Sequence, residues 1–301
     1  MPNVLLSGSS GFLGSAIAGW LQEQGYRTSR LVRSAPSGEG RVAWDPESGQ
    51  IDREAVARCA PDLVINLAGE PIAQRWTAER RRKIRESRVR GTRALAEAIA
   101  SLPRRPATLI SSSAIGYYGA HRDDEVLDES SAGGDDFLAQ LAREWEGATE
   151  PAAAAGIRVV LWRTGLVLAR GGGVLARMLP PFQMGVGGRL GDGRQWMSWM
   201  ALQDFVAALA FAIATPTLSG PVNMVAPEPV RNDEFTETLG RVLNRPALLP
   251  VPKAGLSLLF GEMADNTILA SQRVVPKKLA GAGFVFRHPR LDGALRAELR
   301  R

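Results

Sequence analysis

Short apolar runs alternate with longer amphipathic stretches along the first half of the chain. The runs predict buried β-strands, which fall at residues 4–6, 28–32, 62–67, 107–112 and 157–162. Apolar positions at helical spacing predict helices at residues 12–24, 77–100 and 137–155. Gly25 stands where the first helix should end, and glycine is common there. Because alternating strands and helices are typical of βαβ units, the pattern predicts an α/β protein with a doubly wound parallel sheet.

The pattern is less regular after Gly165, and prolines recur between short segments from residue 226 onward. An apolar stretch over residues 204–214 predicts one further helix, with Asp204 as its N-cap. We expect a nucleotide-binding domain over residues 1–225 and a small α+β cap domain over residues 226–301. Ligands of open α/β sheets bind at the carboxyl ends of the strands, so the cap should close over that crevice.

Residues 8–14 read Gly-Ser-Ser-Gly-Phe-Leu-Gly, a G-x-x-G-x-x-G sequence between the first predicted strand and the first predicted helix. The glycines permit a tight turn and let backbone N–H groups approach a diphosphate. The amino end of the helix adds partial positive charge. A glycine turn without a ligand is the alternative, but the strand, turn and helix around the motif favour dinucleotide binding.

The residues at the end of the second predicted strand indicate which dinucleotide is bound. An NAD site typically carries Asp or Glu there, which binds the ribose 2′-hydroxyl. This chain has Arg33 and Ser34 instead. Because the planar guanidinium donates two parallel hydrogen bonds, arginine suits a 2′-phosphate. The sequence therefore favours NADP(H) over NAD, with Arg33 as a plain solvated charge being the alternative.

The composition narrows the class of protein. Hydrophobic residues make up 45% and charged residues 23% of the 301 positions, which excludes a disordered chain, a collagen and a coiled coil. The longest clean apolar stretch is far below the ~20 residues of a membrane span, and the first residues lack a secretory signal pattern. The single cysteine, Cys59, fits a reducing compartment. We expect a cytoplasmic protein with no membrane partner.

Charge and histidine content exclude further classes. The chain has 37 Lys and Arg against 31 Asp and Glu, and the resulting charge of +6 suits a phosphate-bearing ligand without requiring nucleic acid. The basic run over residues 80–90 predicts a solvated helix face, because no aromatic stacking platform accompanies it. Two histidines and one cysteine do not give zinc-ligand spacing, so we expect no metal. The expected partner is a small-molecule substrate of unknown identity, and the oligomeric state is left open.

Several motifs together resemble those of extended short-chain dehydrogenases/reductases. Besides the glycine turn, they stand at residues 66–69, 87–92, 111–113 and 117–119. The chain resembles more closely the atypical "epimerase family" branch, which is often labelled NAD-dependent epimerase/dehydratase and has a C-terminal domain of unknown function. The motifs of that branch stand at residues 44–46, 67–70, 75–77, 187–195, 276–279 and 283–287. The resemblance covers essentially the whole chain.

The resemblance implies a Rossmann-like fold with NADP(H) bound across the sheet. It implies diphosphate contacts within residues 8–14, where the candidates are Gly8, Ser10, Gly11, Phe12, Leu13 and Gly14. It implies contacts to the phosphorylated adenosine at Arg33 and Ser34, and to the ribose region at Leu67, Ala68 and Gly69. Arg88 is implied as a cofactor contact, with Lys83 reaching the same pocket. The segment Thr164, Gly165 and Leu166 is implied beside the nicotinamide amide.

The usual catalytic pair of the superfamily is missing. Those enzymes carry Tyr and Lys at positions i and i+4, so that both lie on one helix face and the lysine lowers the pKa of the tyrosine that transfers a proton. No Tyr-x-x-x-Lys occurs in this chain, and Phe137 and Leu141 are the expected occupants of the two positions. Ser113 fits the serine that orients the substrate, and Tyr117 is a candidate proton donor.

Two functions remain open. The first is an NADP(H)-dependent oxidoreductase or nucleotide-sugar-epimerase-like enzyme, in which Tyr117, Tyr118 or His121 supplies the proton. The second is a catalytically inactive NADP(H)-binding protein that senses redox state or acts as a scaffold. Acid–base assistance is worth ~10²–10⁴-fold in rate, so the first reading needs a replacement for the tyrosine. We favour the enzyme, and a sugar-nucleotide substrate is suggested only by kinship.

Overall fold

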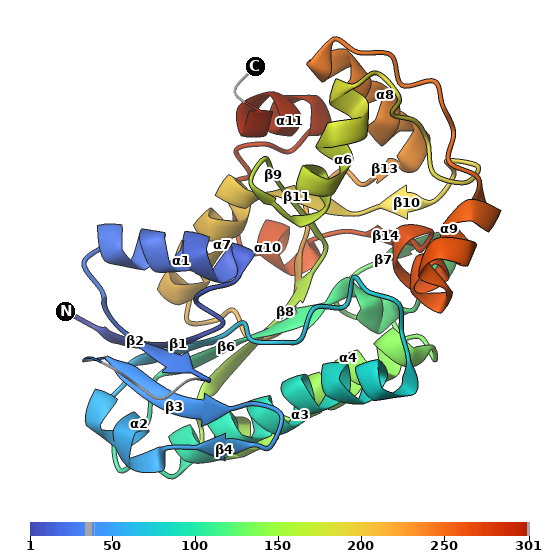
Figure 1. Cartoon of the computed structure of the whole chain (residues 1–301). Helices are drawn as coiled ribbons and strands as arrows, with labels where there is room; N and C mark the ends of the chain where they lie inside the picture. The colour runs from blue at the N-terminus through green and yellow to red at the C-terminus, as the bar shows by residue number, and fades with distance from the viewer. Residues whose placement is uncertain (34–37, 39, 300–301) are drawn as a thin grey trace.

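An eight-stranded sheet forms the centre of the computed structural model, which describes residues 1–33, 38 and 40–299 (Figure 1). The strands lie in the order β12-β8-β6-β5-β1-β2-β3-β4, and every neighbouring pair is parallel except β3 and β4. Their bounds are β1 (Asn3–Ser7), β2 (Arg27–Val32), β3 (Arg41–Asp45), β4 (Gln50–Ile51), β5 (Leu63–Asn66), β6 (Thr108–Ala114), β8 (Arg158–Thr164) and β12 (Gly220–Met224). The strand order reverses beside β1, so the predicted doubly wound, Rossmann-like sheet is confirmed.

Helices cover both faces of the sheet. Successive residues of a strand point to opposite sides, so an apolar strand has two faces to bury. On β1, Val4 and Leu6 pack in one apolar cluster with residues of α1 and α7, whereas Leu5 packs in another with residues of α2, α3 and α5. The helices are α1 (Phe12–Glu23), α2 (Arg53–Cys59), α3 (Ala78–Ala100), α5 (Glu150–Ala154) and α7 (Leu202–Ala214). The three β1 side chains are at most 1% exposed, so the sheet has a core on each face.

A further layer lies above the sheet in Figure 1 and is built from two separate parts of the chain. The first part holds β9 (Leu166–Ala169), α6 (Gly173–Gln183), β10 (Trp196–Met197) and β11 (Trp199–Ala201). The second part holds β13 (Val230–Arg231), α8 (Asn232–Leu243), α9 (Lys253–Phe260), η2 (Ala264–Ile268), β14 (Ser271–Val274) and α11 (Leu291–Leu299). The short helix α10 (Lys277–Gly281), which follows β14, packs on the sheet itself through Leu279, in the same cluster as α1 and α7. Trp199 of the first part and Phe235 of the second are fully buried in one shared core. Strand β14 pairs in parallel with β7 (His121–Leu127), which joins this layer to the segment after β6.

The single helix expected over residues 137–155 was wrong. The structure divides this stretch into α4 (Phe137–Gly147) and α5. Pro151 stands in the first turn of α5, where its missing N–H costs nothing and its fixed φ suits a helix start. In a helix interior the same ring would clash with the preceding turn, so the proline explains the break.

Asp204 does not cap α7, contrary to the expectation from the sequence. Ala201 occupies the N-cap position, and Asp204 stands in the first turn of the helix and is fully buried. Its carboxylate accepts backbone N–H groups of Arg287 (2.8 Å) and His288 (2.9 Å). Asp204 therefore fastens the segment before α11 to the amino end of α7.

Candidate functional site

The glycine turn joins β1 to α1 in a conformation that requires glycine at two positions. Gly8 has a φ of +69°, and a Cβ atom on Gly14 would lie 2.0 Å from the carbonyl oxygen of Gly8. Gly11 is the N-cap of α1, and no described side chain caps this helix and no acidic residue stands in its first turn. The amide groups at the start of α1 are therefore open to an anionic ligand.

The residues expected to line the cofactor ribose lie directly beside this turn. A Cβ atom on Gly8 would come within 2.9 Å of the carbonyl carbon of Leu67. The buried Ser7 hydroxyl accepts the backbone N–H groups of Leu67 (3.0 Å) and Ala68 (3.2 Å) and donates to Asn66 Oδ1 (2.6 Å). These bonds hold the end of β1 against the end of β5, so the two predicted contact segments form one surface.

Arg88 lies beneath Gly69, the residue that follows Leu67 and Ala68. It is 8% exposed, and its Nη1 donates to the carbonyl oxygens of Glu70 (2.9 Å) and Ile84 (3.2 Å). A Cβ atom on the exposed Gly69 would lie 2.8 Å from Cζ of Arg88, so only glycine leaves room for the guanidinium. The other side of Arg88 faces the ring of Trp145, 5.0 Å from its centroid.

The remaining predicted cofactor residues are less closely grouped. Arg33 is exposed directly after β2, and Ser34 lies outside the described residues. Lys83 is partly exposed and pairs with Glu79 on its own helix (3.3 Å). Thr164 ends β8 and Leu166 begins β9, while Gly165 between them is packed against the backbone of the segment at Ser198.

Phe12, at the start of α1, is covered by the hairpin that leads into α6. A Cβ atom on Gly172 would lie 2.1 Å from the Phe12 ring, and one on Gly173 would lie 3.2 Å from it. Gly172 is the N-cap of α6. Gly172 and Gly173 therefore let the upper layer close onto the predicted diphosphate turn.

Ser113 is hydrogen-bonded into a buried ionic network. It is 3% exposed and donates to Glu146 Oε1 of α4 at 2.6 Å. The same carboxylate accepts two hydrogen bonds from Arg163 of β8, at 2.8 and 2.9 Å. Burial alone would lower the pKa of Arg163, but the bonds with Glu146 outweigh it and raise the pKa of the guanidinium. Because the carboxylate and the guanidinium satisfy one another, the Ser113 proton is held toward α4.

Sequence reasoning missed Glu146 and Arg163. A signal was present at Arg163, because a charge that directly follows the apolar run Val159–Trp162 in a buried strand needs a buried partner. Nothing in the local sequence identified Glu146 as that partner. The pairing follows from how α4 lies against β6 and β8.

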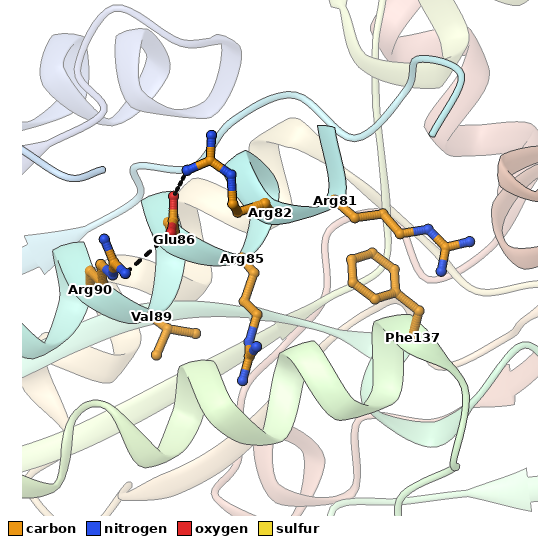
Figure 2. Close-up of a pocket in the computed structure, with 7 residues that line it drawn as sticks. All are labelled: Arg81, Arg82, Arg85, Glu86, Val89, Arg90 and Phe137. Carbon is orange, nitrogen blue, oxygen red and sulfur yellow. Dashed lines mark hydrogen bonds and ion pairs between the residues drawn. The ribbon is translucent and has the colours of Figure 1, made fainter. Parts of the chain in front are cut away.

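The helix positions that face the end of β6 are not those expected from the sequence. Phe137 packs edge-on against Trp76, with ring centroids 5.2 Å apart, and lies beside Arg81 at the surface (Figure 2). Leu138 contacts the turn after β6 instead. A Cβ atom added to Gly116 of that turn would lie 3.3 Å from the Cβ atom of Leu138. Helical spacing puts Ala142 and then Glu146 on the same face as Leu138. A Tyr-x-x-x-Lys pair aimed at β6 would therefore stand at Leu138 and Ala142.

The tyrosines follow β6 in the short helix η1 (Ile115–Tyr118). Tyr118 is fully buried, donates to Asn223 Oδ1 (2.7 Å) and accepts from Arg163 Nη1 (3.2 Å). Burial raises the pKa of Tyr118 to about 12, which disfavours it as a proton donor at neutral pH. Tyr117 is only partly buried, and its ring lies over the Arg163 guanidinium, 3.4 Å from Cζ.

The turn that carries both tyrosines is held by a residue of the C-terminal part. The side-chain amide of Gln272 on β14 donates to the carbonyl oxygens of Ile115 (2.9 Å) and Gly119 (2.7 Å), one before and one after the tyrosines. Gln272 is 7% exposed. The position of Tyr117 is thus set jointly by β6 and by β14.

A cavity of about 470 Å³ lies between α3 and α4, apart from the glycine turn. It is lined by Phe137 of α4 and by six residues of α3, as Figure 2 shows: Arg81, Arg82, Arg85, Glu86, Val89 and Arg90. Its arginines are paired: Arg82 and Arg90 bond to Glu86, and Arg85 bonds to Glu144. The basic run thus forms a solvated face whose charges are largely compensated, while Arg88 points inward.

Among the described residues, no three His, Cys, Asp or Glu side chains gather as a metal site would require. Over the same residues, no helix combines the length and the apolar character needed to cross a bilayer.

Residues 4–225 match the model of a family described as "NAD dependent epimerase/dehydratase family", and residues 251–298 match a domain of unknown function (DUF1731). "Epimerase family protein Mb2239" of Mycobacterium bovis is 47% identical over 97% of this chain and 96% of its own length. "Epimerase family protein SDR39U1" of Homo sapiens is 35% identical over 97% and 98%. A relative from Arabidopsis thaliana, 39% identical over 98% of this chain and 86% of its own length, is described as chloroplastic.

Solved structures of epimerase family proteins are also similar to this chain. The crystal structure of human epimerase family protein SDR39U1 with NADPH has a TM-score of 0.89 and 32% identity, and covers 99% of both chains. A nucleoside-diphosphate sugar epimerase from Corynebacterium glutamicum has a TM-score of 0.80 and 36% identity, over 99% of this chain and 58% of that one.

Proposed function

The chain belongs to the NAD dependent epimerase/dehydratase family, and from that premise we propose that it binds NADP(H) as an atypical short-chain dehydrogenase/reductase. The observation that carries the proposal is the amino end of α1, which no described side chain caps. The tight turn of Gly8, Gly11 and Gly14 leads into it, and the turn lies against Leu67 and Ala68. Backbone amides and a helix amino end are the groups that bind a dinucleotide diphosphate in this fold.

The residues present fit such a cofactor. The diphosphate would take the amides at the start of α1, and the ribose on the nicotinamide side would lie along residues 67–69. The cofactor would supply a hydride donor or acceptor, while the protein contributes binding and orientation. Arg33, at the end of β2, supports the phosphorylated dinucleotide, and the relative solved with NADPH is consistent with this choice.

Isothermal titration of the full-length protein with NADPH and NADH tests the proposal. We expect NADPH to bind more tightly, and Arg33→Ala to remove most of that preference by deleting the 2′-phosphate contact. Arg27→Ala is the matched control, because Arg27 is an exposed arginine at the opposite end of the same strand. Absence of binding to either nucleotide overturns the proposal, and equal affinities overturn only the choice of NADP(H).

The reaction class follows from the family and from what the site lacks. We propose an oxidoreductase or nucleotide-sugar-epimerase-like enzyme that uses Tyr117, the less buried of the two η1 tyrosines, for proton transfer. A second candidate is a non-catalytic NADP(H)-binding sensor or scaffold. It is favoured by Leu138 and Ala142, because neither side chain can donate or accept a proton where a Tyr-x-x-x-Lys pair would stand.

Two assays separate the two candidates: oxidation of NADPH with a panel of carbonyl compounds, and conversion of sugar nucleotides to their epimers, which leaves the cofactor unchanged overall, followed by chromatography with NADP⁺ present. An enzyme is expected to lose turnover in Tyr117→Phe while it keeps its affinity for NADPH. Binding with no turnover of any compound supports the sensor or scaffold. Unchanged turnover in Tyr117→Phe would exclude that tyrosine as the proton donor.

A further inference from the structure

Arg88 is a buried cation without a carboxylate of its own. The two hydrogen bonds that the structure gives it both leave from Nη1 and both end on carbonyl oxygens. Glu70 is the acidic residue within electrostatic reach, and its carboxylate is bonded to Arg80 at 3.0 Å. Burial lowers the pKa of Arg88 to about 10, so the guanidinium stays charged at neutral pH. The ring of Trp145 offers it only the weaker attraction of a π face.

The other buried arginine near the site differs in this respect. Arg163 is 3% exposed, but Glu146 neutralises it through two hydrogen bonds. Of the two arginines that are buried among the described residues, Arg88 is therefore the one that lacks a bonded carboxylate. Its Nε and Nη2 lie against the exposed Gly69, where an added Cβ atom would be 3.2 and 3.0 Å away.

The strand order fixes which half of a dinucleotide this charge meets. Arg33 follows β2 on one side of β1, whereas Gly69 and Arg88 lie beyond β5 on the other side. A dinucleotide whose diphosphate lies at the β1 turn crosses the sheet there, with its adenosine toward β2. Arg88 therefore belongs to the nicotinamide half.

Resting on the proposed NADP(H) binding, we propose that Arg88 makes the site select the reduced cofactor, NADPH, over NADP⁺. The nicotinamide ring carries a positive charge when oxidised and none when reduced, so a buried cation without a bonded carboxylate in that half of the site penalises only the oxidised form. In a site of low dielectric such a repulsion between like charges changes affinity by about tenfold or more. The protein is accordingly poised to take up NADPH, as a reductase or a sensor of the reduced pool would be.

The test is the ratio of two dissociation constants, for NADP⁺ by calorimetry and for NADPH by its fluorescence, on the full-length protein. We expect the wild type to bind NADPH about tenfold more tightly. Arg88→Met should bring the ratio close to one, while Arg88→Lys, which keeps the charge, should preserve the preference. Arg82→Met is the matched control, because Arg82 is an exposed arginine of the same helix, and its ratio should equal that of the wild type.

The wild-type measurement decides the matter even where a variant fails to fold. Equal affinities, or tighter binding of NADP⁺, overturn the inference, as does a wild-type preference that survives intact in Arg88→Met. If Arg88→Met does not fold, Gly69→Ala serves in its place, since the new methyl group displaces the guanidinium and should also lower the ratio. Failure of both nucleotides to bind would instead overturn the proposed function.

Discussion

Replacing Glu146 by glutamine is expected to cost about 3–5 kcal/mol of folding free energy, because it leaves a buried guanidinium without its counter-charge. The Arg163 side chain is 4% exposed and the Glu146 side chain 11%, so water cannot take over the lost bonds. The substitution also turns the charge-assisted bond from Ser113 into a weaker neutral one. The free energy of unfolding of a typical protein is about 5–15 kcal/mol, so this loss is a large fraction of the total stability.

Urea unfolding followed by circular dichroism measures this loss, and the melting temperature should fall by roughly 5–8 °C. Glu97→Gln is the matched control, since Glu97 and Arg53 form an exposed pair with about half of each side chain in water, and its cost should stay below about 1 kcal/mol. Combining Glu146→Gln with Arg163→Met should recover part of the stability, because no buried charge then stays unpaired. A cost below about 1 kcal/mol for Glu146→Gln would refute the reasoning.

Two further substitutions test the phenol and the glycine turn. The pKa of Tyr118 is raised to about 12 by burial, so its contribution to stability is complete below pH 10 and lost as the pH rises through 12. Urea midpoints should therefore fall between pH 10 and 12 more steeply in the wild type than in Tyr118→Phe, and parallel curves would contradict this. Gly14→Ala should abolish NADPH binding in a titration, because the new methyl group would lie 2.0 Å from the Gly8 carbonyl oxygen, and Gly19→Ala, which meets nothing within 4 Å, should bind normally.

The fold was predictable where the signal is local. The glycine turn at residues 8–14 and the helix that ends near Gly25 lie within a few residues of what the pattern predicts. The sequence prediction missed the break before Pro151, because the apolar spacing continues on both sides of the proline. The proline itself indicates a helix start at this point. Such errors concern the reading of the sequence and not a lack of information in it.

The candidate site was predictable only in part, because its chemistry depends on how elements meet. Whether α4 turns Phe137 or Leu138 toward β6 differs by one residue in the sequence, and contacts with distant elements, such as the bond from Trp145 to Thr92 of α3, accompany the orientation that the structure shows. Glu146 and Arg163 are 17 residues apart on different elements, so no spacing rule pairs them. Arg88 was expected at the cofactor, but its lack of a bonded carboxylate emerges only once its neighbours are in place.

The amide of Gln272 that clasps the η1 turn has a consequence for how the chain is made. This residue is synthesised more than 150 positions after Ile115, whose carbonyl oxygen it binds. Domains fold as units while the ribosome extends the chain from the N-terminus. The nucleotide-binding half therefore emerges from the ribosome before Gln272 is made, and its tyrosine turn gains these two hydrogen bonds only after β14 has been translated.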